Sequence, residues 1–163
     1  MAPTAELKAR RRSDYPFQLD YRTRWNDNDM YDHMNNSVYN FLFDSVINAY
    51  LIEHCGLHPP TSQQYALAVH SSADFFGSIA FPVVAELALR VVKFGRSSVT
   101  YEVALFEKGI EAVKAVGEFV HVFVDRATGR PSTNGMSEGL RRGLEQIYKP
   151  SKDGFMPSNG SKL

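Results

Sequence analysis

One segment of the chain, residues 36–55, carries a helical pattern long enough to dictate the fold. Apolar side chains recur there at three- and four-residue steps from Val38 to Tyr50, which places them on one face of an α-helix. Gly56 follows as a C-terminal stop signal. At 1.5 Å per residue this helix would be about 30 Å long. Its apolar face is broad, so we expect it to lie against a wide surface such as a β-sheet.

The segments on both sides of this helix predict that sheet. Residues 17–25 alternate apolar and polar side chains, and this period of two indicates a half-buried strand. Four segments with strand character follow the helix, and the last three of them form an antiparallel meander. A short closing helix is expected over residues 137–148. The four later strand segments are 65–73, 86–92, 99–106 and 111–125.

This order of elements defines the expected fold class. One strand, one long helix and several antiparallel strands give an α+β domain, in which one long central helix is wrapped by a curved antiparallel sheet. The chain has 163 residues, of which 44% are hydrophobic, enough for one core. It contains no internal repeat and no second domain. We assign the domain to residues 17–148.

Charge and cysteine content exclude several classes of protein. Eighteen Lys and Arg balance eighteen Asp and Glu, so no global field exists to hold a nucleic acid. Cys55 is the only cysteine, which excludes an internal disulfide or a thiolate metal cage. The five histidines are scattered, and no metal site is expected. No apolar run approaches the roughly 18 residues of a membrane span, and no secretory signal is present, so we expect a soluble intracellular protein.

The two ends of the chain differ in composition from the domain. Residues 1–16 are polar and basic and show neither structural period, so a flexible N-terminal segment is expected. Residues 149–163 are rich in Pro, Gly and Ser and predict a flexible tail. The tail ends in Ser161, Lys162 and Leu163, and a C-terminal Ser-Lys-Leu is the peroxisomal import address. The sequence therefore predicts a peroxisomal import receptor as a partner and the peroxisomal matrix as the location.

A polar loop, residues 26–35, joins the first strand to the long helix. It holds three carboxylates, a histidine and three asparagines, and no branched aliphatic side chain. The loop ends at the start of the helix, whose unpaired N–H groups can stabilise an oxyanion, so a nearby carboxylate is placed for hydrolysis of an acyl group. The alternative is a turn that only caps the helix through Asn35 or Asn36. Asp27 is expected to brace the loop.

The loop also carries a family resemblance. The strings TRWNDND at 23–29 and HMNN at 33–36, with Tyr39, resemble the hot-dog-fold acyl-CoA thioesterases of the 4-hydroxybenzoyl-CoA thioesterase type. The likeness extends over about residues 17–131 and includes the turn at 93–98. In these proteins an antiparallel sheet wraps the central helix, and two protomers pair with active sites at their interface. The resemblance therefore implies a hot-dog fold and a homodimer or tetramer.

The resemblance also implies roles for individual residues. The family's catalytic carboxylate falls on Asp29, as general base or as nucleophile; the sequence leaves both routes open. The backbone N–H of Asn36 falls on the oxyanion donor. His33 either orients the loop, hydrogen-bonds near the thioester, or is purely structural. Asp32 replaces the usual glycine, and Tyr31 stands where plant acyl-carrier thioesterases have a catalytic Asn.

Substrate binding is assigned by the same resemblance. CoA has three phosphates and needs local cationic or N–H donors, which the 93–98 turn offers, with Arg126 and Arg130 as lesser candidates. The segment 70–74 is expected to face Asp29 across the dimer. The expected CoA contacts are Lys93, Arg96, Ser97 and Ser98, and the aromatics available to an acyl slot are Tyr39, Phe43, Phe75 and Phe76.

The expected function is therefore an acyl-CoA thioesterase that releases a carboxylic acid and CoA. CoA would be part of the substrate, and no separate cofactor is expected. Two alternatives stay open: a non-catalytic acyl-CoA binding module, and a hot-dog hydratase or dehydratase acting on enoyl thioesters.

Overall fold

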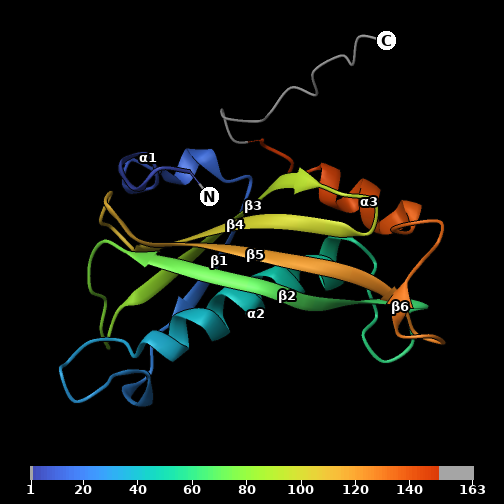
Figure 1. Cartoon of the computed structure of the whole chain (residues 1–163). Coiled ribbons are helices and arrows are strands. Elements are labelled where there is room, and N and C mark those ends of the chain that lie inside the picture. Colours follow the sequence, from blue (N-terminus) through green and yellow to red (C-terminus); the bar gives the residue numbers. More distant parts are fainter. Residues whose placement is uncertain (1, 151–163) are drawn as a thin grey trace, which may run out of the picture.

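Within the described residues, six β-strands form one antiparallel sheet, and helix α2 (Asn36–His54) lies along one of its faces (Figure 1). The structure is a computed structural model that describes residues 2–150. The remaining elements are α1 (Thr4–Lys8), β1 (Phe17–Arg22), β2 (Gln64–Phe75), β3 (Val84–Phe94), β4 (Ser98–Glu107), β5 (Val113–Asp125), β6 (Arg130–Pro131) and α3 (Glu138–Glu145).

The strand order leaves β1 and β2 at the two edges of the sheet. The order is β1-β3-β4-β5-β2, with the short β6 paired to β5, and every pairing is antiparallel. β2 is twelve residues long and pairs only with β5 within the described chain. One long edge of the sheet is therefore open to a further strand.

Helix α2 forms because it is capped at its start and has an apolar face over its whole length. The Oδ1 atom of Asn35 accepts a hydrogen bond from the Ser37 N–H at 3.0 Å, which satisfies a group that the helix leaves unpaired. Val46 and Ile47 are fully buried in one core with the inward residues of β3, β4 and β5. Gly117 of β5 makes this close packing possible, because a Cβ there would lie within 2.5 Å of the Phe43 ring.

The predicted α+β class and the central helix wrapped by an antiparallel sheet are confirmed. The ends of some elements differ from the prediction. The first strand stops at Arg22 rather than residue 25, because the Thr23 hydroxyl bonds the Val83 carbonyl at 2.7 Å and the chain then enters a 3-10 turn at Trp25–Asp27. The closing helix is shorter than the predicted 137–148.

The N-terminal segment differs from the flexible lead-in expected over residues 1–16. Residues 4–14 form α1 and a 3-10 turn that pack on the face of the sheet away from α2 (Figure 1). The Leu7 side chain is 1% exposed and lies in a small apolar cluster with Phe106. The sequence showed no period here because a helix of five residues is too short to have one.

A buried ionic cluster fastens this segment to the sheet. Glu102 of β4 is 5% exposed; its carboxylate accepts hydrogen bonds from Arg10 Nε at 2.9 Å and from the Tyr15 hydroxyl at 2.8 Å. The Arg90 guanidinium lies 2.8 Å from the same carboxylate. Burial alone would raise the pKa of Glu102, but the hydrogen bond from Arg10 and the charge of Arg90 outweigh burial and lower it.

Of the predicted tail, residues 149–163, the structure describes only Lys149 and Pro150. Ser161, Lys162 and Leu163 lie outside the described residues. Within residues 2–150, no helix combines the length and the apolar character needed to cross a membrane.

Candidate active site

The loop that joins β1 to α2 is held in one shape by backbone hydrogen bonds. The Asp29 N–H donates to the His33 carbonyl at 2.7 Å, the Met34 N–H to the Ile79 carbonyl at 2.7 Å, and the Asn35 N–H to the Asp27 carbonyl at 2.8 Å. The loop stands out from the rest of the fold beyond the start of α2 (Figure 1). These bonds fix Asp29 relative to the first turn of the helix.

The two oxygens of the half-buried Asp29 carboxylate have different surroundings. Oδ1 accepts hydrogen bonds from the backbone N–H groups of Tyr31 at 2.7 Å and His33 at 3.3 Å. Oδ2 accepts none within the described residues. One oxygen therefore orients the side chain, and the other is available to a water molecule or to a substrate carbon.

The first turn of α2 has an unpaired backbone N–H at Asn36, which follows Asp29 closely in the sequence. Asn35 already caps the N–H of Ser37, whereas the N–H of Asn36 makes no hydrogen bond to another described residue. Such an N–H, at the positive end of a 19-residue helix, can polarise a carbonyl group. The His33 side chain is exposed, and its backbone N–H and carbonyl both bond to Asp29.

Asp27 braces the loop, as expected from the sequence. Its carboxylate is 1% exposed and accepts hydrogen bonds from the Arg24 N–H at 2.7 Å, the Arg24 Nη2 at 3.0 Å and the Tyr21 hydroxyl at 3.0 Å. Burial would raise the pKa of Asp27, but these hydrogen bonds lower it. Asp32 has a φ of 59°, a left-handed conformation that Asp tolerates better than most residues.

The four aromatic residues expected at an acyl slot have different positions. Tyr39 is buried and its ring lies 5.0 Å from that of the half-exposed Phe75, so these two lie at the surface of the core near the start of α2. Burial raises the pKa of Tyr39. Phe43 is a core residue against Gly117, and Phe76 packs in the cluster on the opposite face of the sheet. Phe43 and Phe76 therefore serve packing.

The turn expected to bind CoA lies at the other end of the molecule. The Arg96 carbonyl accepts a hydrogen bond from the Met136 N–H at 3.0 Å, and its guanidinium bonds the Thr133 carbonyl. These contacts join the turn at 93–98 to the loop before α3, beside the C-terminal end of α2. Asp29 precedes the N-terminal end of that helix, whose 19 residues span about 28 Å. Within one protomer the structure does not bring Asp29 together with Lys93, Arg96, Ser97 and Ser98.

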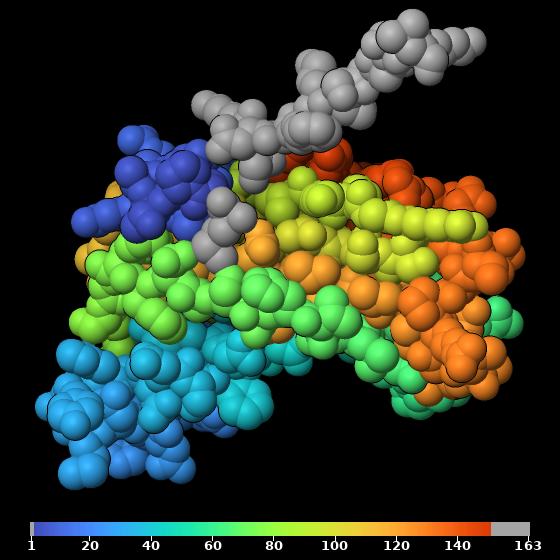
Figure 2. Space-filling model, in the orientation of Figure 1, coloured from blue at the N-terminus to red at the C-terminus, as the bar shows by residue number. Residues whose placement is uncertain are grey.

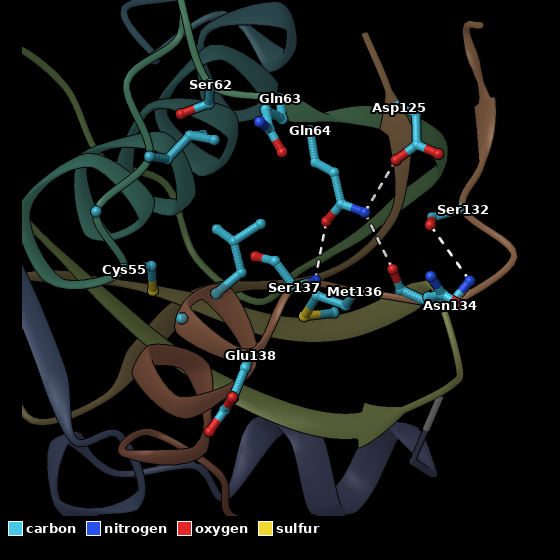
Figure 3. Close-up of a pocket in the computed structure, with 15 residues that line it drawn as sticks. Cys55, Ser62, Gln63, Gln64, Asp125, Ser132, Asn134, Met136, Ser137 and Glu138 are labelled. Atoms are coloured by element: carbon cyan, nitrogen blue, oxygen red, sulfur yellow. Dashed lines mark hydrogen bonds between the residues drawn. The ribbon is translucent and has the colours of Figure 1, made fainter. Parts of the chain in front are cut away.

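A pocket of about 670 Å³ lies at this second end of the molecule (Figure 3). Its walls come from the segment after α2, the ends of β2 and β5, the loop before α3 and the start of α3. Gln64 lies at its centre: the side-chain amide donates to Asp125 Oδ1 at 3.1 Å and to the Gly135 carbonyl at 3.0 Å, and its oxygen accepts the Ser137 N–H at 2.9 Å. Asp29 does not line this pocket. No sequence pattern predicted this pocket, because its lining residues come from segments that are far apart in the sequence.

Apolar side chains are exposed around the Asp29 loop and the start of α2. Met30 is 98% and Tyr31 81% exposed. Trp25 is also exposed, and its ring lies 5.9 Å from that of Phe81; Phe41 is exposed on the first turns of α2. In Figure 2 the light-blue Asp29 loop region stands out at the lower left of the body. Exposed apolar groups concentrated in one region are typical of an interface.

Neither a metal cluster nor a reactive thiol appears in the part of the chain that the structure describes. Residues 2–150 contain no group of three or more His, Cys, Asp or Glu side chains placed to hold a metal ion. Cys55 is buried, and burial raises the pKa of its thiol to about 12. Its thiolate, the nucleophilic form, is therefore negligible at neutral pH.

The sequence matches the family model of the thioesterase-like superfamily over residues 23–143. The chain belongs to this superfamily. The match spans the Asp29 loop, α2, strands β2 to β6 and most of α3. It does not establish the narrower 4-hydroxybenzoyl-CoA type within the family. A comparison with curated proteins found no match.

Solved structures support the same fold. The PA5185 protein from Pseudomonas aeruginosa strain PAO1 is 43% identical, with a TM-score of 0.81 over 85% of this chain and 95% of that chain. A 1,4-dihydroxy-2-naphthoyl-CoA thioesterase from Synechocystis is 11% identical, with a TM-score of 0.70 over 78% and 94%. A Staphylococcus aureus protein in complex with CoA is 15% identical, with a TM-score of 0.74 over 90% and 93%.

Proposed function

We propose that this protein hydrolyses acyl-CoA thioesters to a carboxylic acid and CoA. The observation that carries the proposal is the Asp29 carboxylate, which has one oxygen fixed by two backbone N–H groups and the other free, in the loop that leads to the unpaired N–H of Asn36. Membership of the thioesterase-like superfamily supports it. So do two structural relatives, one a CoA thioesterase and one solved with CoA.

In the first route, Asp29 acts as a general base. Its free oxygen takes a proton from water as the water oxygen attacks the thioester carbon, and the Asn36 N–H stabilises the negative charge on the carbonyl oxygen. The C–S bond then breaks, and the thiolate of CoA takes up the proton. In the second route, the same oxygen attacks the thioester carbon directly, and the C–S bond breaks to release the thiolate of CoA. Water then hydrolyses the resulting mixed anhydride to the carboxylic acid and the free Asp29 carboxylate.

We propose that two protomers complete each active site. Asp29 and the 93–98 turn lie at opposite ends of α2 in one chain, so a two-fold pairing with antiparallel α2 helices would bring the Asp29 loop of one protomer to the turn of its partner. The open β2 edge and the exposed apolar side chains near Asp29 support such an interface. Tyr39 and Phe75 would then line the acyl group, and Lys93 and Arg96 would meet the phosphates of CoA. A tetramer would contain two such pairs.

A thiol-release assay with acyl-CoAs of different chain length and aromaticity tests the function. Asp29→Asn keeps the shape of the side chain but removes its charge, so we expect kcat/KM to fall at least a hundredfold, on the order of what general bases contribute. Asp32→Asn is the matched control, because it removes a charge from the same loop and Asn also tolerates the left-handed conformation. It should keep its activity.

Each other outcome of this assay has a definite meaning. CoA ester binding without thiol release would point to a binding module. Hydration of an enoyl-CoA without thiol release would point to a hydratase. Full activity of Asp29→Asn would contradict the assigned role of this carboxylate.

We further propose that the protein is imported into peroxisomes through Ser161, Lys162 and Leu163. The support is the sequence Ser-Lys-Leu at the end of the chain, which is a receptor-read address. A fluorescent protein fused to the N-terminus should co-localise with a peroxisomal marker. Deleting Leu163 should leave the fusion outside peroxisomes, and unchanged localisation after the deletion would refute the proposal.

A further inference from the structure

The pocket at the C-terminal end of α2 is a concave site with side-chain hydrogen bonds in its wall. Gln64 forms its centre with three hydrogen bonds to Asp125, Gly135 and Ser137 (Figure 3). These bonds tie β2, β5 and the start of α3 together. A cavity of about 670 Å³ lies in the range of sites for small molecules.

Charge decides which chemical group this pocket can accept. Two carboxylates, Asp125 and Glu138, line it, and no Lys, Arg or His is among its lining residues. A phosphate or carboxylate inside would be repelled. Leu57, Met136 and Leu140 add apolar surface. The lining therefore suits a neutral, flat group that has both apolar faces and polar edges.

Two side-chain amides in the lining are free to bind such a group. Gln63 and Asn134 both line the pocket, and neither side chain makes a hydrogen bond within residues 2–150. A side-chain amide can pair with adenine in two bonds, accepting from its N6 amino group and donating to N7. An acyl chain would offer these amides no hydrogen-bond partner, whereas a group with polar edges would.

Cations stand directly outside the pocket. The guanidinium of Arg126 donates to the carbonyl of Ser62, a lining residue, at 2.8 Å. The guanidinium of Arg96 donates to the carbonyl of Thr133, which lies between the lining residues Ser132 and Asn134. Positive charge at the rim and negative charge inside match a molecule that joins a neutral base to phosphates.

We propose that this pocket binds the adenine of CoA, with the phosphates of CoA at the rim beside Arg96 and Arg126. This inference rests on the proposed function, because it takes CoA as part of the substrate. The proposal also explains why the 93–98 turn lies far from Asp29 of its own chain. The turn and the pocket would together bind the nucleotide of a substrate whose thioester lies at the Asp29 loop of the second protomer.

A side chain at Gly139 tests the proposal by filling the pocket. Gly139 lines the cavity, and a Cβ placed on it meets no atom within 4 Å. We expect Gly139→Phe to weaken binding of adenosine 3′,5′-bisphosphate, measured by calorimetry, at least tenfold and to raise KM for acyl-CoA similarly. Arg142→Phe, the matched control, puts the same side chain at an exposed position of α3 outside the pocket lining and should stay within twofold. The wild-type protein should bind the uridine analogue at least tenfold more weakly than the adenosine compound.

A substrate without a nucleotide separates this inference from the proposed function. Gly139→Phe should lose far less activity toward an acyl-N-acetylcysteamine thioester, which has no nucleotide, than toward acyl-CoA. If the wild type hydrolyses acyl-CoA but Gly139→Phe binds the bisphosphate normally, the pocket assignment is wrong and the function stands. If the wild type binds the bisphosphate but releases no thiol, the function is wrong. Should Gly139→Phe fail to fold, Gln63→Ala/Asn134→Ala decides by the same binding measurement, where an unchanged affinity refutes the proposal.

Discussion

Asp27 and Asp29 lie two residues apart in one loop, yet their carboxylates have different surroundings. Asp27 is buried and both of its oxygens accept hydrogen bonds, from Arg24 and Tyr21. Asp29 is half-buried and keeps one oxygen free. A carboxylate that is fully hydrogen-bonded stabilises the fold and is a poor base, whereas one with a free oxygen can take a proton. This difference identifies Asp27 as the residue that stabilises the loop and supports the proposed catalytic role of Asp29.

The buried, hydrogen-bonded carboxylate of Asp27 predicts that the stability of the protein depends on pH. Because the pKa of Asp27 is lower in the folded than in the unfolded protein, its stabilising effect is present above about pH 4, the unfolded value, and is lost as the pH falls through the folded pKa. Asp27→Asn should lower the free energy of unfolding at pH 7 by about 1–3 kcal/mol. Urea titrations at several pH values should show that the difference in free energy of unfolding between wild type and variant disappears below about pH 4. If this difference stayed constant down to about pH 2, the ionised Asp27 carboxylate would not be the source of the stabilisation.

At the scale of elements, the accuracy of the sequence-based prediction depends on the length of each helix or strand. Helix α2 and strands β3 to β5 have ten or more residues each, so their periods were clear and their ends were placed within a few residues. Helix α1 has five residues, and its one buried side chain, Leu7, cannot form a pattern. The loop carboxylates were identifiable because such a polar run does not pack in a core, but which of them is buried depends on Tyr21 and Arg24 reaching Asp27.

The N-terminal segment gives the prediction that belongs to this scale. Leu7 is 1% exposed, so Leu7→Ala should lower the free energy of unfolding by about 2–4 kcal/mol, as for other buried leucines. Leu7→Met keeps the volume and should cost less than about 1.5 kcal/mol. Denaturant unfolding of both variants measures this difference. If residues 1–16 were a loose lead-in, both substitutions would be neutral.

At the scale of the whole molecule, the proposed active site depends on a pairing of two protomers, and no local sequence pattern encodes such a pairing. The sequence marked both the Asp29 loop and the 93–98 turn, but the order of residues does not show that α2 separates them by about 28 Å. The pocket beside the turn could not be predicted either, because Gln63 and Asn134 line one pocket only after β2 and the loop before α3 come together. In the proposed dimer, each site takes its carboxylate from one protomer and its nucleotide-binding groups from the other.

Mixed dimers test this arrangement directly. Asp29→Asn removes the base and Lys93→Ala/Arg96→Ala removes the cations, so dimers of either variant alone should have little activity at low acyl-CoA concentration. A dimer with one protomer of each kind contains one site with native Asp29 and a native turn, and one site that lacks both. Mixed dimers, purified with two different affinity tags, should therefore recover about half of the wild-type kcat/KM per dimer. If Asp29 acted with the turn of its own chain, each site of the mixed dimer would carry one defect, and its activity would not exceed the mean of the two parents.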